Sequence, residues 1–229
     1  MLVVGSAPCL FEDLKEALKL RPFAEIMLIN GACTAIERAE HMLAGHEEKA
    51  EFFAEARRKA FPNTPIRIHA CAHPHQLKHG IQQLCPSVTD WWPIEQGIGA
   101  TSASRAAKIA KYRLGFDEVI LCGSPLDDSG YFPGEGKGIP QSLSCVRVGD
   151  PGVLKGVITP PHNGEYSTRP GENMKAQETR IVKAYRTRFK ELAEGEFKGW
   201  VFSMSGYTRE VLGYPPTRKE HVSDYTSIR

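Results

Sequence analysis

The chain has 229 residues, of which 41% are hydrophobic and 24% charged, and its formal net charge is +2. This length and composition predict one large domain with its own core rather than two full domains. The small, scattered charge gives no sign of a surface for duplex nucleic acid or for an anionic membrane. No stretch approaches the roughly 20 apolar residues of a membrane span, and the N-terminus lacks a signal-peptide pattern, so we expect a cytoplasmic protein without a membrane span.

Cysteine and histidine usage predicts no metal site. The six cysteines are widely spaced, which favours reduced, buried thiols. His69, Cys71, His73 and His75 would point to one side of an extended segment, and this leaves structural zinc as a less favoured alternative. Pro74 interrupts the strand and no CxxC or HExxH pattern is present, so we interpret the segment as a strand end with ordinary loop histidines.

The first half of the chain alternates short apolar runs with helical periodicity. The predicted elements are a strand at 2–4, a helix around 14–20, a strand at 25–31, a helical stretch at 34–60 with a potential break at Gly45, a strand at 65–72, a candidate strand at 87–92, a helix at 101–114 and a strand at 119–123. Strands that alternate with helices imply right-handed crossovers and a parallel sheet. The paired Trp91 and Trp92 are expected to fill the core, with stacking on a ligand as the alternative.

The second half begins with a long irregular segment. Residues 124–172 are rich in glycine and proline, and so long a stretch without regular structure is typical of a functional lid. A helix at 173–193, a strand at 200–203 and a short helix within 205–212 follow. We therefore predict an α/β fold: a Rossmann-like, mainly parallel sheet with helices on both faces, forming one domain over 1–214 with a flexible tail at 215–229.

Ligands of open parallel sheets bind beyond the carboxyl ends of the strands. The turn formed by Gly5, Ser6, Ala7 and Pro8 follows the first strand and precedes a helix, so its backbone amides and hydroxyl are candidates for a phosphate cradle. No Gly-Lys-Ser/Thr follows, which excludes a Walker loop. A purely structural turn is the alternative.

Two other predicted strand and helix ends carry suitable polar groups. Asn30 and Gly31 follow the second strand, where the amide can bind a ribose hydroxyl or a base, or simply form a turn. Thr101 and Ser102 precede the alanine-rich helix, where they either cap the helix or bind an anion. The sequence thus predicts several ligand-binding groups along one edge of the sheet.

These segments together resemble a known family. Residues 3–10 (VVGSAPCL), 28–30 (LIN), 101–102 (TS) and 114–123 (LGFDEVILCG) resemble the bacterial CMP-sialic acid-dependent sialyltransferases of the Campylobacter type. They equally resemble a related clan of archaeal 6-hydroxymethylpterin diphosphokinase-like proteins and small uncharacterised phage and prophage proteins. The resemblance covers roughly residues 1–130, with a weaker similarity at 202–213.

The resemblance implies a nucleotide site at the carboxyl ends of the strands. The residues at the positions that contact the donor in that family are Gly5, Ser6, Pro8, Asn30, Thr101 and Ser102. Ser6 and Ala7 replace the family's asparagine and second glycine, which leaves the first loop fewer donors.

The catalytic residues depart further from the family pattern. The first tyrosine after the Cys-Gly pair is Tyr131, which we expect to contact the leaving phosphate, and the histidine nearest the family's catalytic position is His162. His162 is our candidate general base toward an acceptor hydroxyl, with an ordinary loop position as the alternative. Asp127 and its neighbour Asp128 lie just beyond a strand end, where they can assist catalysis, share a divalent cation or form a solvated turn.

Three functions remain open from the sequence. The first is a nucleotide-sugar-dependent glycosyltransferase, which requires no cation. The second is a diphosphotransferase of the hydroxymethylpterin type, in which Asp127 and Asp128 or Glu135 would hold Mg²⁺. The third is a nucleotide-binding phage protein without catalysis. In each case the partner is a nucleotide or nucleotide sugar, and homo-oligomerisation is left open.

Overall fold

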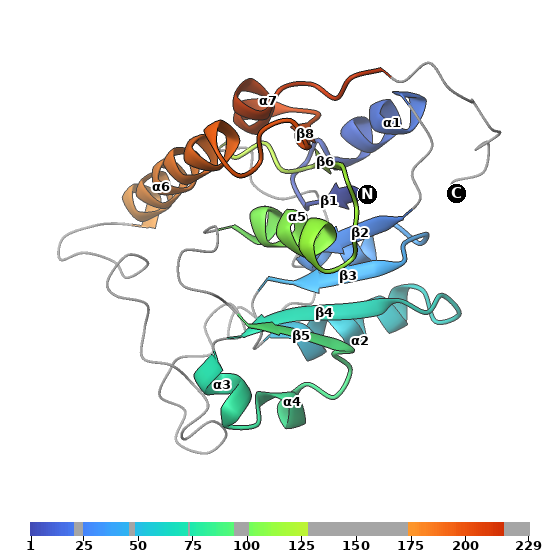
Figure 1. Ribbon diagram of the computed structural model, residues 1–229. Helices are drawn as coiled ribbons and strands as arrows, with labels where there is room; N and C mark the ends of the chain where they lie inside the picture. The colour runs from blue at the N-terminus through green and yellow to red at the C-terminus, as the bar shows by residue number, and fades with distance from the viewer. Residues whose placement is uncertain (21–24, 46–48, 73, 94–100, 128–173, 218–229) are drawn as a thin grey trace.

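The computed structural model describes residues 1–20, 25–45, 49–72, 74–93, 101–127 and 174–217. Its centre is a seven-stranded, wholly parallel sheet with the order β5-β4-β3-β2-β1-β6-β8 (Figure 1). The strands are β1 (Leu2–Val4), β2 (Ile26–Ile29), β3 (His41–Ala44), β4 (Arg67–Ala72), β5 (Asp90–Pro93), β6 (Val119–Cys122) and β8 (Val201–Ser203). The predicted Rossmann-like α/β fold is confirmed.

Helices cover both faces of this sheet. They are α1 (Leu10–Leu20), the 3-10 helix η1 (Asn30–Thr34), α2 (Ala50–Ala60), α3 (Pro74–Lys78), α4 (Ile81–Leu84), α5 (Ser102–Tyr112), α6 (Met174–Glu194) and α7 (Gly206–Leu212). One core contains residues of α1, η1 and α2, and the other contains residues of α5 and α6. Figure 1 shows α5 on the near side of the sheet and α2 behind it.

Short, uninterrupted apolar runs form the central strands because both of their faces are buried. Leu2 and Val4 point into the core of α1 and α2, whereas Val3 points into the core of α5. Trp91 packs against the core that contains residues of α1 and α2, and Trp92 packs against the core that contains residues of α5 and α6. The two tryptophans therefore contribute to the core, which was the favoured interpretation of their sequence.

The predicted helical stretch at 34–60 is wrong in its first half. Its helix-forming composition is overridden at β3, which is buried between β2 and β4 and contributes residues to both cores. In the described part of this stretch, the α-helix is α2, from Ala50 onward. The sequence did carry a signal for β3, because the run Met42-Leu-Ala ends on Gly45 as the β1 run ends on Gly5.

A buried arginine secures the connection between β2 and β3. Arg57 of α2 is 1% exposed, and its guanidinium donates to the carbonyl oxygens of Cys33, Ile36 and Glu37. The same group lies 4.5 Å from the ring centroid of Phe61. These bonds stabilise the η1 segment, which would otherwise bury carbonyl groups without partners.

The order in which strands are added to the sheet reverses between β1 and β6. Strands β2 to β5 extend from β1 on one side, and β6 and β8 lie on the other. The loops that follow β1 and β6 approach closely, since a side chain on Gly5 would fall on Gly123 O and the Ser124 hydroxyl. This reversal is the usual position of ligand sites in open α/β sheets.

Part of the predicted organisation lies outside the described residues. This applies to nearly all of the lid at 124–172 and to most of the tail at 215–229. Within the ranges that the structure describes, no helix has the length and apolar character needed to span a bilayer.

We expect Gly123→Ala to lower the free energy of unfolding by about 3 kcal/mol. Gly123 has φ +58°, and an added Cβ would lie 2.6 Å from Gly5 O and 2.7 Å from Leu10 Cβ. The matched control is Gly115→Ala, since Gly115 also has positive φ (+80°) but no atom within 4 Å of the added Cβ. We expect the control to cost about 1 kcal/mol, and urea denaturation that gave equal losses would contradict close packing at Gly123.

Candidate functional site

The carboxyl edge of the sheet brings together many of the residues that the sequence singled out. Gly5 to Pro8 follow β1, Asn30 and Gly31 follow β2, and Thr101 and Ser102 begin α5. The register pairs Val4 with Leu28 and Ile29 with Leu43, so these strand ends lie at one level of the sheet. This edge has two halves: the first lies at β1, β6 and β8, and the second lies at β2, β3 and α5.

Hydrogen bonds between loops close the first half. The amide of Gly5 donates to Cys122 O (2.8 Å) and that of Ala7 to Gly123 O (3.1 Å). Two of the amides in the predicted phosphate cradle are thus bonded to the loop after β6, and phosphate binding by this turn stays a prediction. Ser6 is buried, whereas Pro8 is exposed. The first loop therefore serves mainly to join β1 to β6.

Asp13 ties a third loop to this half. Its carboxylate is buried in the first turn of α1 and accepts hydrogen bonds from Gly123 N (2.8 Å) and from the Ser205 hydroxyl (2.6 Å). Ser205 follows β8, so one carboxylate holds the loops after β6 and β8 against α1. From its sequence position alone, Asp13 is only a favourable negative charge at the start of a helix.

Two cysteines at this position are unsuited to nucleophilic chemistry. Burial, with smaller contributions from the carboxylates of Asp13 and Asp127, raises the pKa of the Cys9 thiol to about 11. Burial likewise raises the pKa of Cys122 far above its ordinary value. Because the thiolate is the reactive form, both cysteines are protonated and inert near neutral pH.

Asn30 lies in the second half. Its backbone has φ +49°, and its side-chain Oδ1 accepts a hydrogen bond of 2.7 Å from the amide of Gly45, which follows β3. Because the backbone N–H of Gly45 is a donor, the Asn30 atom that faces it is the oxygen Oδ1. The Nδ2 group of Asn30 therefore points away from the Gly45 amide. Among the described residues, Nδ2 has no hydrogen-bond partner.

The first turn of α5 packs against the same glycine. A Cβ on Gly45 would lie 2.7 Å from Ser102 Cβ and overlap the Ser102 hydroxyl. Arg105, one turn later, donates from Nη1 to Gly45 O at 2.9 Å. Its Nε is buried and has no partner within the described part of the chain. We call Asn30, Gly45, Ser102 and Arg105 the rim cluster.

Thr101 has a different role from its neighbour. Its hydroxyl oxygen accepts a hydrogen bond from Ser104 N at 3.1 Å, so Thr101 caps α5. The Ser102 hydroxyl makes no hydrogen bond to the described residues and is half-buried. Of the two hydroxyls that the sequence left as caps or ligands, one is a cap and the other remains available to a ligand.

The predicted catalytic residues are placed only in part. Asp127 is exposed beyond β6, whereas Asp128, Tyr131 and His162 lie outside the described residues. Gly31 is buried in η1, where its carbonyl oxygen accepts a bond from Thr34. A hollow of about 510 Å³ between α6 and α7 contains none of the predicted site residues.

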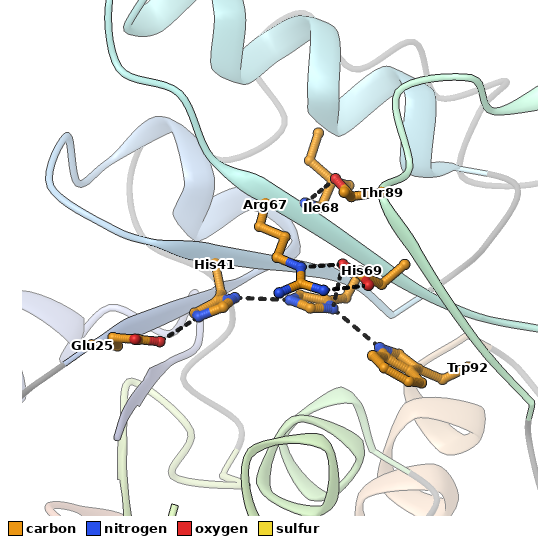
Figure 2. Close-up of polar contacts among 8 residues, drawn as sticks. Glu25, His41, Arg67, Ile68, His69, Thr89 and Trp92 are labelled. Carbon is orange, nitrogen blue, oxygen red and sulfur yellow. Dashed lines mark hydrogen bonds and ion pairs between the residues drawn. The ribbon is translucent and has the colours of Figure 1, made fainter. Parts of the chain in front are cut away.

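A second polar cluster lies on the α5 side of strands β3, β4 and β5, as Figure 2 shows. His41 Nε2 is 2.5 Å from Glu25 Oε2, and His41 Nδ1 is 2.9 Å from His69 Nε2. The indole of Trp92 donates to His69 Nδ1 at 3.1 Å. We call these four residues the histidine chain.

An ion pair flanks the histidine chain. Arg67 binds both carboxylate oxygens of Asp90, at 2.5 and 2.7 Å, and Asp90 Oδ2 lies 3.6 Å from His69 Nδ1. This pairing holds the pKa of Asp90 below its usual range. Burial, with a smaller contribution from His41, lowers the pKa of His69 to about 4. His69 is therefore neutral at physiological pH.

Neither cluster forms a metal site. Within the described ranges, no group of three or more histidine, cysteine, aspartate or glutamate side chains is arranged to hold an ion. The sequence placed His69 and Cys71 on one side of a strand, and both residues are buried. The partners of His69 come from β3 and β5, whose pairing register the sequence alone did not define.

His69 makes folding depend on pH. The unfolded chain binds this proton near pH 6.5 and the folded chain only near pH 4, so between these values the unfolded state holds more protons. We expect the free energy of unfolding to fall as the pH falls through this range, by up to ~3 kcal/mol in total. Urea denaturation at a series of pH values measures the change.

His69→Gln tests the origin of this slope. The variant is expected to be less stable at pH 7, where it loses native hydrogen bonds, and to show a shallower fall toward pH 4. The matched control, His79→Gln, changes an exposed histidine and should retain the wild-type slope. An unchanged slope in His69→Gln would show that another group causes the dependence.

Comparison of the chain with protein-family models, curated proteins and solved structures finds no match. The resemblance described from the sequence motifs therefore remains an expectation.

Proposed function

We propose that the protein binds the phosphate-bearing part of a nucleotide or nucleotide sugar at the rim cluster and acts as a nucleotide-sugar-dependent glycosyltransferase. One observation carries the binding proposal. Three hydrogen-bond donors, Asn30 Nδ2, Ser102 Oγ and Arg105 Nε, have no partner among the described residues, although all three side chains contact one glycine.

The chemistry of these donors favours an anion. A guanidinium is charged at every physiological pH and carries no acceptor. The first turn of α5 adds amides that have no partner within a helix, together with the positive end of the helix dipole. Neutral amide and hydroxyl donors beside these groups suit phosphate and ribose oxygens, which are the groups of a nucleotide.

The transferase part of the proposal rests on the resemblance. In glycosyl transfer from a nucleotide sugar, the bond from the sugar to the phosphate breaks and the nucleotide leaves with the additional negative charge. Donors held before reaction stabilise that charge without reorganisation. Arg105 and Ser102 would supply this stabilisation, and the candidate catalytic residues His162 and Asp127 would act toward the acceptor.

Asn30→Asp tests the binding site with little change in structure. A carboxylate can still accept the hydrogen bond from Gly45 N, but it replaces the Nδ2 donor with negative charge. We expect affinity for a nucleotide or nucleotide sugar to fall at least tenfold, because like charges oppose each other at close range. Thermal-shift titration with CMP-, UDP- and GDP-sugars and their nucleotides provides the measurement.

Asn63→Asp is the matched control, since Asn63 is exposed in the loop that follows α2. This variant should bind as the wild type does. If no member of the panel stabilises the wild type, or if both variants bind equally well, the rim cluster is not the nucleotide site.

Turnover separates the chemical alternatives. Release of nucleotide from a nucleotide sugar that persists in EDTA supports the glycosyltransferase. Transfer of a diphosphate that requires Mg²⁺ would instead support the diphosphotransferase, and tight binding without turnover would support a nucleotide-binding protein without catalysis.

A further inference from the structure

The histidine chain has a defined direction. The indole nitrogen of Trp92 can only donate a hydrogen bond, so His69 Nδ1 must be the acceptor. A neutral imidazole then carries its proton on Nε2, and His69 Nε2 donates to His41 Nδ1. His41 in turn carries its proton on Nε2, and this N–H group donates a hydrogen bond to Glu25 (Figure 2).

His69 has a second partner within reach. Its Nδ1 lies 3.6 Å from Asp90 Oδ2, a distance too long for a good hydrogen bond. In the observed state this nitrogen is an acceptor for Trp92 and cannot donate to the carboxylate. A proton on Nδ1 would reverse that preference, because it would repel the indole N–H and attract Asp90.

We propose that the histidine chain is a proton-responsive switch in which the uptake of one proton moves His69 from Trp92 to Asp90. The added proton bonds to His69 Nδ1, and the proton on His69 Nε2 passes along the existing hydrogen bond to His41 Nδ1. His41 becomes an imidazolium, His69 stays neutral with its proton on Nδ1, and the Trp92 indole loses its acceptor.

The surrounding charges determine where the positive charge resides. Glu25, which precedes β2, lies against His41, whereas His69 is fully buried and has the Arg67 guanidinium on the same strand. Asp90 is already neutralised by Arg67. Burial disfavours a charge on His69, so the charge belongs on His41 beside the Glu25 carboxylate.

The switch acts on the edge of the sheet. Trp92 belongs to β5, which among the described strands pairs with β4 alone. The Trp92 ring also lies 5.6 Å from the Arg113 guanidinium, which follows α5. Protonation would therefore leave Trp92 held by packing and by Arg113 while removing its hydrogen bond to β4.

Nuclear magnetic resonance of the intact chain tests this directly. Nitrogen spectra of labelled histidines distinguish Nδ1 from Nε2 protonation, and Trp92→Phe identifies the Trp92 indole signal. At pH 8 we expect both His41 and His69 to be protonated on Nε2. As the pH is lowered and the chain takes up the proton, the positive charge should appear on His41, His69 should change to its Nδ1 form, and the Trp92 indole signal should shift and exchange faster with the same midpoint.

Glu25→Gln provides the matched perturbation. Glutamine can still accept the hydrogen bond from His41 but lacks the charge that favours the imidazolium, so the midpoint should fall by about 1 pH unit. The control Glu16→Gln removes an exposed carboxylate that pairs with Lys19 on α1, and its midpoint should match the wild type.

Three results would overturn the proposal. The first is His69 protonated on Nδ1 at pH 8, the second is a Trp92 indole signal that does not change while His41 titrates, and the third is a midpoint unaffected by Glu25→Gln.

Discussion

The geometry of the carboxyl edge depends on the buried carboxylate of Asp13. This group joins α1 to the loops after β6 and β8, which come from distant parts of the chain. A buried carboxylate is costly unless donors satisfy it, and here a backbone amide, a hydroxyl and the N-terminal end of a helix do so. The loops are consequently fixed at the position where an α/β sheet ordinarily offers space to a ligand. The donors without a partner among the described residues lie in the other half, at β2, β3 and α5.

This division explains why the two halves use glycine differently. Gly5 and Gly123 allow two loops to touch and leave little room between them. Gly45 instead lets the first turn of α5 approach the end of β3, which brings Ser102 and Arg105 to Asn30. In the first half the polar groups satisfy one another, whereas in the second half several donors have no partner among the described residues. A ligand would replace the missing acceptors.

The sequence was sufficient to predict most of the layered fold. Apolar runs that end on glycine located β1, β2 and β6, and alanine spacing located α5. It failed at β3, where helix-forming residues occupy a strand whose conformation is determined by its neighbours. For the candidate site, Asn30 and Ser102 were predictable because each directly follows a strand or begins a helix. Gly45, Arg105 and the histidine chain were not, because their contacts depend on strand order and on which helix covers which strand.

The hydrogen bonds from Arg57 to the segment between β2 and β3 have a consequence for local unfolding of the molecule. The connection from β2 to β3 contains η1 but no α-helix of its own, and its carbonyl groups depend on a side chain from α2. That segment and α2 therefore cannot separate without exposing one guanidinium and several carbonyl oxygens together. They should behave as a single cooperative unit, in which the amides of both segments become open to deuterium in the same event.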